Sequence, residues 1–162
     1  MDAGWLETYD RYYDTKVHKI FDSVFKQLKE HKHYTYTVGD MAFFRRWYTG
    51  LDNDEDRAKV KKLVASGQIE IVHGGLVSTD EATTNYSDIL RNFEVAHDFL
   101  KQEFGVVPKV GWQLDPFGHS AANAELFAQM GMEAMFFARI NGPEKDERKA
   151  KQDMEFIWTP EF

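Results

Sequence analysis

The fold is best predicted from the stretch Gly111-Trp112-Gln113-Leu114-Asp115-Pro116-Phe117-Gly118-His119-Ser120. Residues 109–114 are mostly apolar and are typical of a strand. Ser120 is a favourable N-cap for a helix over residues 120–130, and Gly131 ends that helix. The stretch therefore predicts a strand that passes directly into a helix, which is the repeating unit of α/β folds.

Asp115 lies at the junction of this predicted strand and helix. Pro116 disfavours the α conformation for the residue before it, so we expect Asp115 to be extended at the last position of the strand. Gly118 permits the tight turn into the helix. Because an Asp-Pro pair is also a common turn initiator, two interpretations stay open: a carboxylate aimed into a cleft, or a turn.

Strands and helices alternate along the rest of the chain. Between residues 6 and 30, apolar residues recur every three or four positions and predict a long helix whose buried face is Tyr9, Tyr13, Val17, Ile20, Val24 and Leu28. The further predicted elements are strands at 34–38, 69–72 and 134–138, and helices at 41–48, 55–65 and 86–104. Residues 142–153 are charged, and we expect them to be solvated.

This order predicts an α/β fold of βαβ units, with mostly parallel strands and flanking helices. Four strands do not close a barrel, so we expect a partial (β/α) barrel. The chain begins directly in a helix and ends in the apolar run 156–160 with nothing left for it to pack against. We interpret residues 1–162 as a single fragment of a larger domain.

Composition excludes several classes of function. The chain has 162 residues and a formal net charge of −7, which repels nucleic-acid phosphates. It contains no cysteine, so a metal would need histidine and carboxylate ligands. No apolar run reaches the ~18 residues of a membrane span. Aromatic residues make up 15% of the chain, and we expect most of them to lie in the core.

Ligands of parallel α/β proteins gather at the carboxyl ends of the strands, and this rule sorts the histidines. His31 and His33 precede a predicted strand, so we expect them to be solvated loop residues. His73 and His119 follow predicted strands, so both are candidate site residues. For His73 the alternative is local hydrogen bonding within its own loop.

Residues 112–120 resemble the nucleophile motif of the glycoside hydrolase family 38 α-mannosidases of the lysosomal type. Residues 2–6 resemble the end of the family's His-x-Asp-x-Gly-Trp motif, and residues 41–47 resemble its aromatic helix. Further matches in the same order extend the resemblance over nearly the whole chain. They are Gly67-Gln68-Ile69-Glu70-Ile71-Val72-His73-Gly74-Gly75, Asp80-Glu81-Ala82 and Leu126-Phe127-Ala128-Gln129-Met130-Gly131.

The resemblance implies retaining hydrolysis of terminal α-linked mannose from oligosaccharides or N-glycans, with a catalytic zinc bound by two Asp and two His. It makes Asp115 both the nucleophile and a zinc ligand, and Asp2 a second zinc ligand. It places Trp5 and Phe117 in the mannose subsite, and Arg139 beside the substrate or the nucleophile. The implied partners are a mannose-containing oligosaccharide and the rest of the parent polypeptide, in the lysosome, vacuole or secretory pathway.

The sequence departs from the family pattern in three places. The first zinc histidine would stand two residues before Asp2, ahead of Met1. The second zinc histidine and the acid/base Asp belong to regions of the family beyond Phe162. Leu76 occupies a position where the family commonly has Trp. Since two of four ligands rarely hold zinc tightly and a nucleophile needs an acid, we expect residues 1–162 alone to be nearly inactive.

Two alternatives stay open. One is a metal-dependent, deacetylase-like hydrolase whose metal is bound by His73, Asp115 and His119. The other is a non-catalytic sugar-binding module, which would bind mannose without a metal and independently of Asp115. The family 38 interpretation is favoured because it alone accounts for residues 2–5 as well as for residues 115–118.

Overall fold

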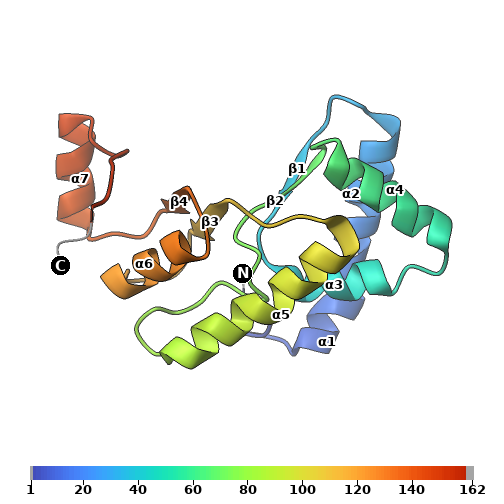
Figure 1. Cartoon of the computed structure of the whole chain (residues 1–162), viewed down its shortest axis with the longest axis horizontal. Coiled ribbons are helices and arrows are strands. Elements are labelled where there is room, and N and C mark those ends of the chain that lie inside the picture. Colours follow the sequence, from blue (N-terminus) through green and yellow to red (C-terminus); the bar gives the residue numbers. More distant parts are fainter. Residues whose placement is uncertain (1, 160–162) are drawn as a thin grey trace.

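The computed structural model describes residues 2–159 and has an α/β fold (Figure 1). Its strands are β1 (Tyr36–Val38), β2 (Ile69–Ile71), β3 (Val110–Gln113) and β4 (Ala134–Phe137). Its helices are α1 (Tyr9–Tyr12), α2 (His18–Glu30), α3 (Met41–Thr49), α4 (Asp54–Ala65), α5 (Tyr86–Phe104), α6 (Ala121–Gln129) and α7 (Gly142–Lys151). A π-helical turn, Tyr13–Val17, joins α1 to α2. The predicted order of strands and helices is confirmed up to β4, and α7 was not predicted.

The strands form two parallel pairs that follow each other along the chain. β1 pairs with β2, with Tyr36 opposite Ile69, and β3 pairs with β4. His73, just after β2, joins the two pairs, because its backbone N–H donates to the carbonyl oxygen of Val110 at 2.5 Å. Helices connect successive parallel strands, as in (β/α) barrels, and no closed barrel is formed within residues 2–159.

Aromatic side chains supply much of the packing. The larger core is formed by α2 to α5 with β1 and β2. In this core, the ring centroids of Phe21 and Trp47, which stack, are 5.4 Å apart, and those of Tyr48 and Phe104 are 4.9 Å apart. A smaller core, formed mainly by α5 and α6, contains Ile89, Phe93, Leu126, Phe127 and Met132. This smaller core lies against β3, because Met132 and Phe127 both approach Gly111.

The first helical run has the predicted buried face except at one position. Leu28 is buried, and Tyr9, Tyr13, Val17 and Val24 are partly buried against the larger core. α2 buries Phe21, Phe25 and Leu28, whereas Ile20 is 52% exposed. The π-helical turn explains the difference, because its wider turn takes up one extra residue and shifts the face that follows. The prediction that Ile20 is buried is wrong.

The junction after β3 also differs from the prediction at one point. β3 ends at Gln113, so Asp115 lies in a bend beyond the strand rather than at its last position. The turn into α6 is as predicted: Gly118 has a φ of 127°, and the hydroxyl oxygen of Ser120 accepts a hydrogen bond from the N–H of Ala122. The position of Asp115 is therefore set by a turn rather than by the strand ladder.

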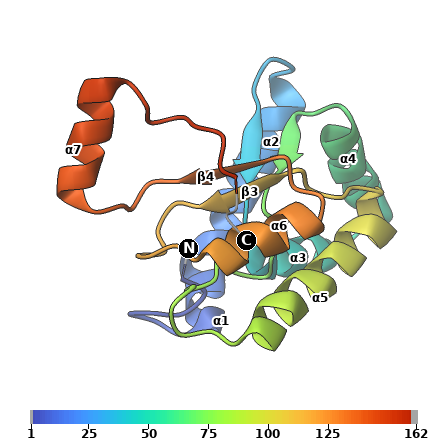
Figure 2. The ribbon, with the colours of Figure 1, turned by 60° about the vertical axis from the view of Figure 1, so that its left-hand side comes forward.

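Residues 142–151 are charged and solvated as expected, and they also form the helix α7. None of the residues of α7 is buried, and the helix stands apart from the other elements in both views (Figures 1 and 2). Ion pairs between residues four apart, Glu144 with Arg148 and Glu147 with Lys151, stabilise it locally. Its helical conformation therefore depends on local interactions rather than on burial.

We predict that Gly111→Ala destabilises the fold. The added Cβ would lie 2.8 Å from Cδ2 of Phe127 and 3.3 Å from Sδ of Met132, both in the smaller core. Overpacking of this kind costs about 1–3 kcal/mol of the free energy of unfolding, which chemical denaturation measures.

Gly142→Ala is the matched control, because nothing lies within 4 Å of its added Cβ. It should change the free energy of unfolding by less than about 0.5 kcal/mol. Equal stability of the two variants would contradict the prediction.

Candidate active site

An acidic and a basic side chain meet at the carboxyl ends of β3 and β4. Asp115 follows β3 and Arg139 follows β4, and Nε and Nη2 of Arg139 lie 2.7 and 2.6 Å from Oδ1 of Asp115. The guanidinium carbon of Arg139 lies 5.3 Å from the ring centroid of Phe117. The structure thus brings together three of the residues singled out from the sequence.

This cluster is open to solvent. The side chains of Asp115 and Arg139 are 60% and 56% exposed, and Phe117 is also exposed. Both guanidinium contacts are to Oδ1, and no hydrogen bond to Oδ2 of Asp115 is found within residues 2–159. One oxygen of the carboxylate is therefore oriented, and the other is accessible to a ligand.

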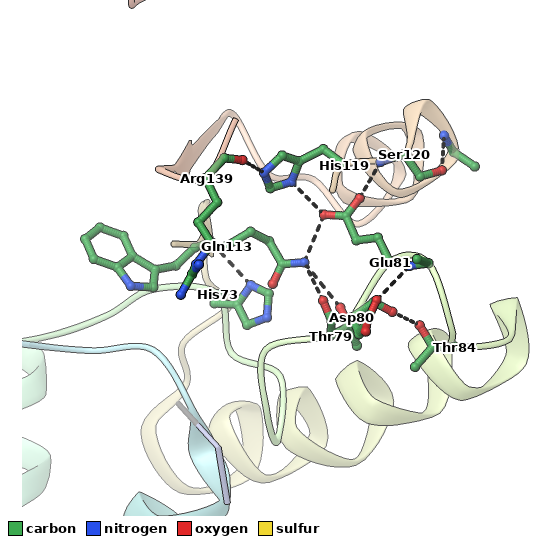
Figure 3. Close-up of polar contacts among 12 residues, drawn as sticks. His73, Thr79, Asp80, Glu81, Thr84, Gln113, His119, Ser120 and Arg139 are labelled. Carbon is green, nitrogen blue, oxygen red and sulfur yellow. Dashed lines mark hydrogen bonds and ion pairs between the residues drawn. The ribbon is translucent and has the colours of Figure 1, made fainter. Parts of the chain in front are cut away.

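A buried carboxylate, that of Glu81, is linked through His119 to Arg139 of this cluster (Figure 3). The side chain of Glu81, in the loop after β2, is only 2% exposed. Its Oε1 accepts a hydrogen bond from Nε2 of Gln113 at 3.0 Å and lies 3.1 Å from Nδ1 of His119. Its Oε2 accepts from the backbone N–H of Ser120 at 2.6 Å. Glu81 therefore ties the loop after β2 to β3 and to the start of α6.

His119 connects this carboxylate to the segment after β4. Nε2 of His119 lies 3.0 Å from the backbone carbonyl oxygen of Arg139, and the ring packs against Phe137 with centroids 4.8 Å apart. Both ring nitrogens of His119 therefore face oxygen atoms of the protein. Neither nitrogen is left to bind a metal.

His73 lies inside the fold rather than at the site. It is fully buried against the rings of Phe93 and Phe127, and its Nδ1 accepts the backbone N–H of Trp112 at 3.3 Å. Burial lowers the pKa of His73 to about 4, and the nearby charge of Asp40 only partly opposes this shift. The geometry makes His73 a buried structural histidine rather than a site residue, and its ring bonds to β3 rather than within its own loop.

Asp2 and Trp5 lie in the segment before α1. Both residues are exposed. Their neighbours in this segment line a shallow cavity of about 510 Å³ together with Ala42 and Leu76, which follow β1 and β2. The segment therefore runs near the carboxyl ends of the first strand pair. Among residues 2–159, no hydrogen bond or ion pair joins Asp2 or Trp5 to Asp115.

The described residues do not form a zinc site on their own. No three His, Asp or Glu side chains among them are grouped closely enough to hold a metal ion. The expected ligands Asp2 and Asp115 provide carboxylate oxygens only, whereas a tetrahedral zinc site needs four donors. His31 and His33 lie before β1, at the opposite end of the strands from Asp115.

Glu81 and Gln113 have no role in the prediction from sequence. The position of Gln113 could have indicated its role, since it is an inward-facing position of β3, where the side chain is fully buried. A polar residue at such a position indicates a buried hydrogen-bond network. Glu81 lies in an irregular loop, where no periodicity reveals which side chains turn inward.

Comparison with known proteins gives the family. The profile of the glycosyl hydrolases family 38 N-terminal domain matches residues 1–161. The chain belongs to this family. An α-mannosidase of Arabidopsis thaliana is 42% identical over 97% of the chain, and a lysosomal α-mannosidase of Cavia porcellus is 40% identical over the same share. The chain spans only 16% of the length of each of these family 38 relatives.

Solved structures share the fold of this family 38 domain. The α-mannosidase from Enterococcus faecalis matches 84% of the chain, with a TM-score of 0.71 and 18% identity, and the chain covers 15% of it. The 4-α-glucanotransferase from Thermococcus litoralis matches 74% of the chain, with a TM-score of 0.56 and 18% identity, and the chain covers 20% of it. At this identity the likeness concerns the fold alone, and the α/β class is confirmed.

The buried His73 predicts a pH dependence of stability in this family 38 domain. Between pH 6.5 and about pH 4, the unfolded chain binds a proton at His73 that the folded chain does not. The free energy of unfolding therefore falls as the pH decreases through this window. The expected fall is roughly 3 kcal/mol, at about 1.4 kcal/mol per pKa unit.

Urea denaturation across this window should show a smaller fall for His73→Asn than for the wild type. Asparagine suits the position because it tolerates the φ of 59° found at His73. His33→Asn, at an exposed loop position, is the control and should keep the wild-type pH dependence. An unchanged pH dependence in His73→Asn would show that the pKa of His73 is not lowered.

Proposed function

We propose that this chain supplies the nucleophile side of the active site of a retaining, zinc-dependent α-mannosidase that removes terminal α-linked mannose from oligosaccharides or N-glycans. The observation that carries the proposal is the ion pair between Asp115 and Arg139 at adjacent strand ends. Asp115 stands in the stretch that resembles the family's nucleophile motif. The names of the relatives, α-mannosidases of plants and animals, support the substrate class.

In this proposal Asp115 attacks through Oδ2, while Arg139 holds Oδ1. The attack on the anomeric carbon forms a mannosyl ester, and the departing oxygen takes a proton from a second carboxyl group about 5 Å away. Water then cleaves the ester with that carboxyl group acting as base, so the anomeric configuration is retained. The resemblance assigns this acid/base Asp to a region beyond Phe162.

Two exposed aromatic residues are proposed to bind the sugar ring. Phe117 is 70% exposed beside Asp115, and its ring is in contact with the guanidinium of Arg139. Trp5 is 75% exposed in the segment before α1. Aromatic faces suit the apolar C–H face of a sugar, and the charged Arg139 is available to its hydroxyl groups.

Asp2 and Asp115 are proposed as two of the four zinc ligands, with the two histidines supplied by parts of the protein other than residues 2–159. Zinc bound there would hold sugar hydroxyl groups and favour distortion of the ring toward an oxocarbenium-like transition state. Because the described residues do not complete this site, the steps above are assigned to side chains alone.

The names of the relatives also bear on location. Lysosomal α-mannosidases of Dictyostelium discoideum and Cavia porcellus are 37% and 40% identical to the chain, which supports a lysosomal or vacuolar location and an oligosaccharide partner. Within residues 2–159, the structure has no helix with the length and apolar character that crossing a membrane requires.

The geometry favours this proposal over the deacetylase-like alternative. That alternative needs His73 and His119 as metal ligands together with Asp115. His73 is fully buried, and both nitrogens of His119 face protein oxygens. The non-catalytic sugar-binding module differs from the proposal in what Asp115→Asn does, so the next experiment separates the two.

Asp115→Asn should abolish turnover of an aryl α-mannoside by the longest natural polypeptide that carries these residues. Amide nitrogen and oxygen are poor nucleophiles, so kcat should fall on the order of 10⁴-fold. NMR of the first product formed by the wild type should show the α anomer, as retention requires.

Asp10→Asn is the matched control, since Asp10 is another exposed Asp paired with an Arg, Arg46, at 2.7 Å. It should leave kcat unchanged. Full activity of Asp115→Asn would refute the assignment of the nucleophile, and a β anomer would refute retention. Mannose binding without turnover, unaffected by Asp115→Asn, would identify the sugar-binding module instead.

A zinc titration tests the division of the metal site. Residues 1–162 alone should show no saturable binding at zinc concentrations that saturate the longest natural polypeptide, because Asp2 and Asp115 supply too few donors. Isothermal calorimetry compares the two samples. Zinc-dependent turnover of a mannoside by residues 1–162 alone would contradict this prediction.

A further inference from the structure

A series of contacts leads from Glu81 through His119 and Arg139 to the proposed nucleophile. Figure 3 shows its first part, from Glu81 to Arg139. The carboxylate of Glu81 meets Nδ1 of His119 at 3.1 Å, and Nε2 of His119 meets the backbone carbonyl oxygen of Arg139 at 3.0 Å. The side chain of Arg139 then meets Oδ1 of Asp115. A buried group of one loop is thereby connected to an exposed carboxylate of another.

The ion pair at the end of this series needs external support. Two exposed, flexible side chains lose conformational entropy when they pair, so such ion pairs are weak unless the groups are already held in place. Arg139 lies between β4 and α7, in a segment of irregular structure at residues 138–141. The hydrogen bond from His119 to its carbonyl oxygen fixes the backbone from which the guanidinium extends.

Glu81 is suited to be the fixed end of the series. Its carboxylate is buried, and both oxygens have partners on other elements, Gln113 in β3 and the N-cap residue Ser120 of α6. The N-terminus of a helix carries partial positive charge, which stabilises a carboxylate there. The side chain of His119, 19% exposed, is in turn confined between Glu81 and the ring of Phe137.

We propose that Glu81 and His119 are positioning residues for Asp115. Glu81 fixes the imidazole of His119, His119 fixes the backbone of Arg139, and Arg139 orients the carboxylate of Asp115. This inference rests on the proposed function, in which Asp115 is the nucleophile. Neither Glu81 nor His119 touches Asp115 itself, so their loss should act through the orientation of its carboxylate and lower kcat more than it raises KM.

The structural test follows the Nε–H signal of Arg139 by proton–nitrogen NMR of the 162-residue chain. The Asp115→Asn variant lacks the ion pair, so its spectrum gives the chemical shift of this signal when the ion pair is lost. His119→Ala removes the link to the Arg139 carbonyl but leaves the bonds of Glu81 to Gln113 and Ser120 in place, and Glu81→Gln removes the charge with little change in shape. In both variants the signal should move toward the Asp115→Asn position.

The matched control is Glu133→Gln. Glu133 is an exposed carboxylate just before β4, at the opposite end of that strand from Arg139, and it pairs with Lys109 at 3.3 Å. This variant should leave the Arg139 signal where it is in the wild type. If Glu81→Gln does not fold, as its denaturation curve will show, His119→Ala decides the test alone.

The functional test uses the longest natural polypeptide that carries these residues, with an aryl α-mannoside as substrate. His119→Ala should lower kcat about 10- to 100-fold with a much smaller change in KM, and Glu133→Gln should change neither. A wild-type Arg139 signal in His119→Ala, or a wild-type kcat despite a displaced signal, would overturn the positioning role. Full activity of Asp115→Asn would instead overturn the proposed function, whatever the NMR result.

Discussion

The arrangement of the site depends on the hydrogen bonds that His73 makes to β3. Its backbone N–H bonds the carbonyl of Val110, and its Nδ1 accepts the N–H of Trp112, so one residue takes the place of a strand ladder between the two pairs. Crowding fixes this junction, since a Cβ on Gly74 would lie 2.6 Å from Cγ of Pro108. Because the strands are parallel and in chain order, the loops that follow them gather at one edge, where Asp115 lies.

The parts of the fold that could be predicted from sequence are those with local causes. The cap at Ser120, the positive φ at Gly105 and Gly131, and the helical spacing of α5 all follow from single residues or short patterns. The burial of Ile20 was wrongly predicted because a π-helical turn breaks the period on which the prediction depends. The helix α7 was not predicted, because it is stabilised by ion pairs between exposed residues and has no apolar face that a periodic sequence pattern would reveal.

For the site, Asp115, Phe117 and Arg139 follow β3 and β4, and the pairing of these strands brings Arg139 into contact with the other two. Their roles stay predictions. The hydrogen bonds of Glu81 could not be predicted from the sequence. Glu81 lies in an irregular loop, which has no repeating pattern of apolar residues and whose path is determined by contacts with the rest of the fold. The roles of Asp2 and Trp5 stay predictions, since they depend on groups outside the described residues.

The π-helical turn at Tyr13–Val17 has a consequence for how sequences of this kind can vary in length. Such a turn is a stretch of α-helix with one extra residue, around which the hydrogen bonds span five residues instead of four. A relative lacking one residue there could keep Phe21, Phe25 and Leu28 in the core unchanged. Only the part before the turn would rotate, by about 100°, which would separate Tyr9 from the ring of Phe43 on which it stacks.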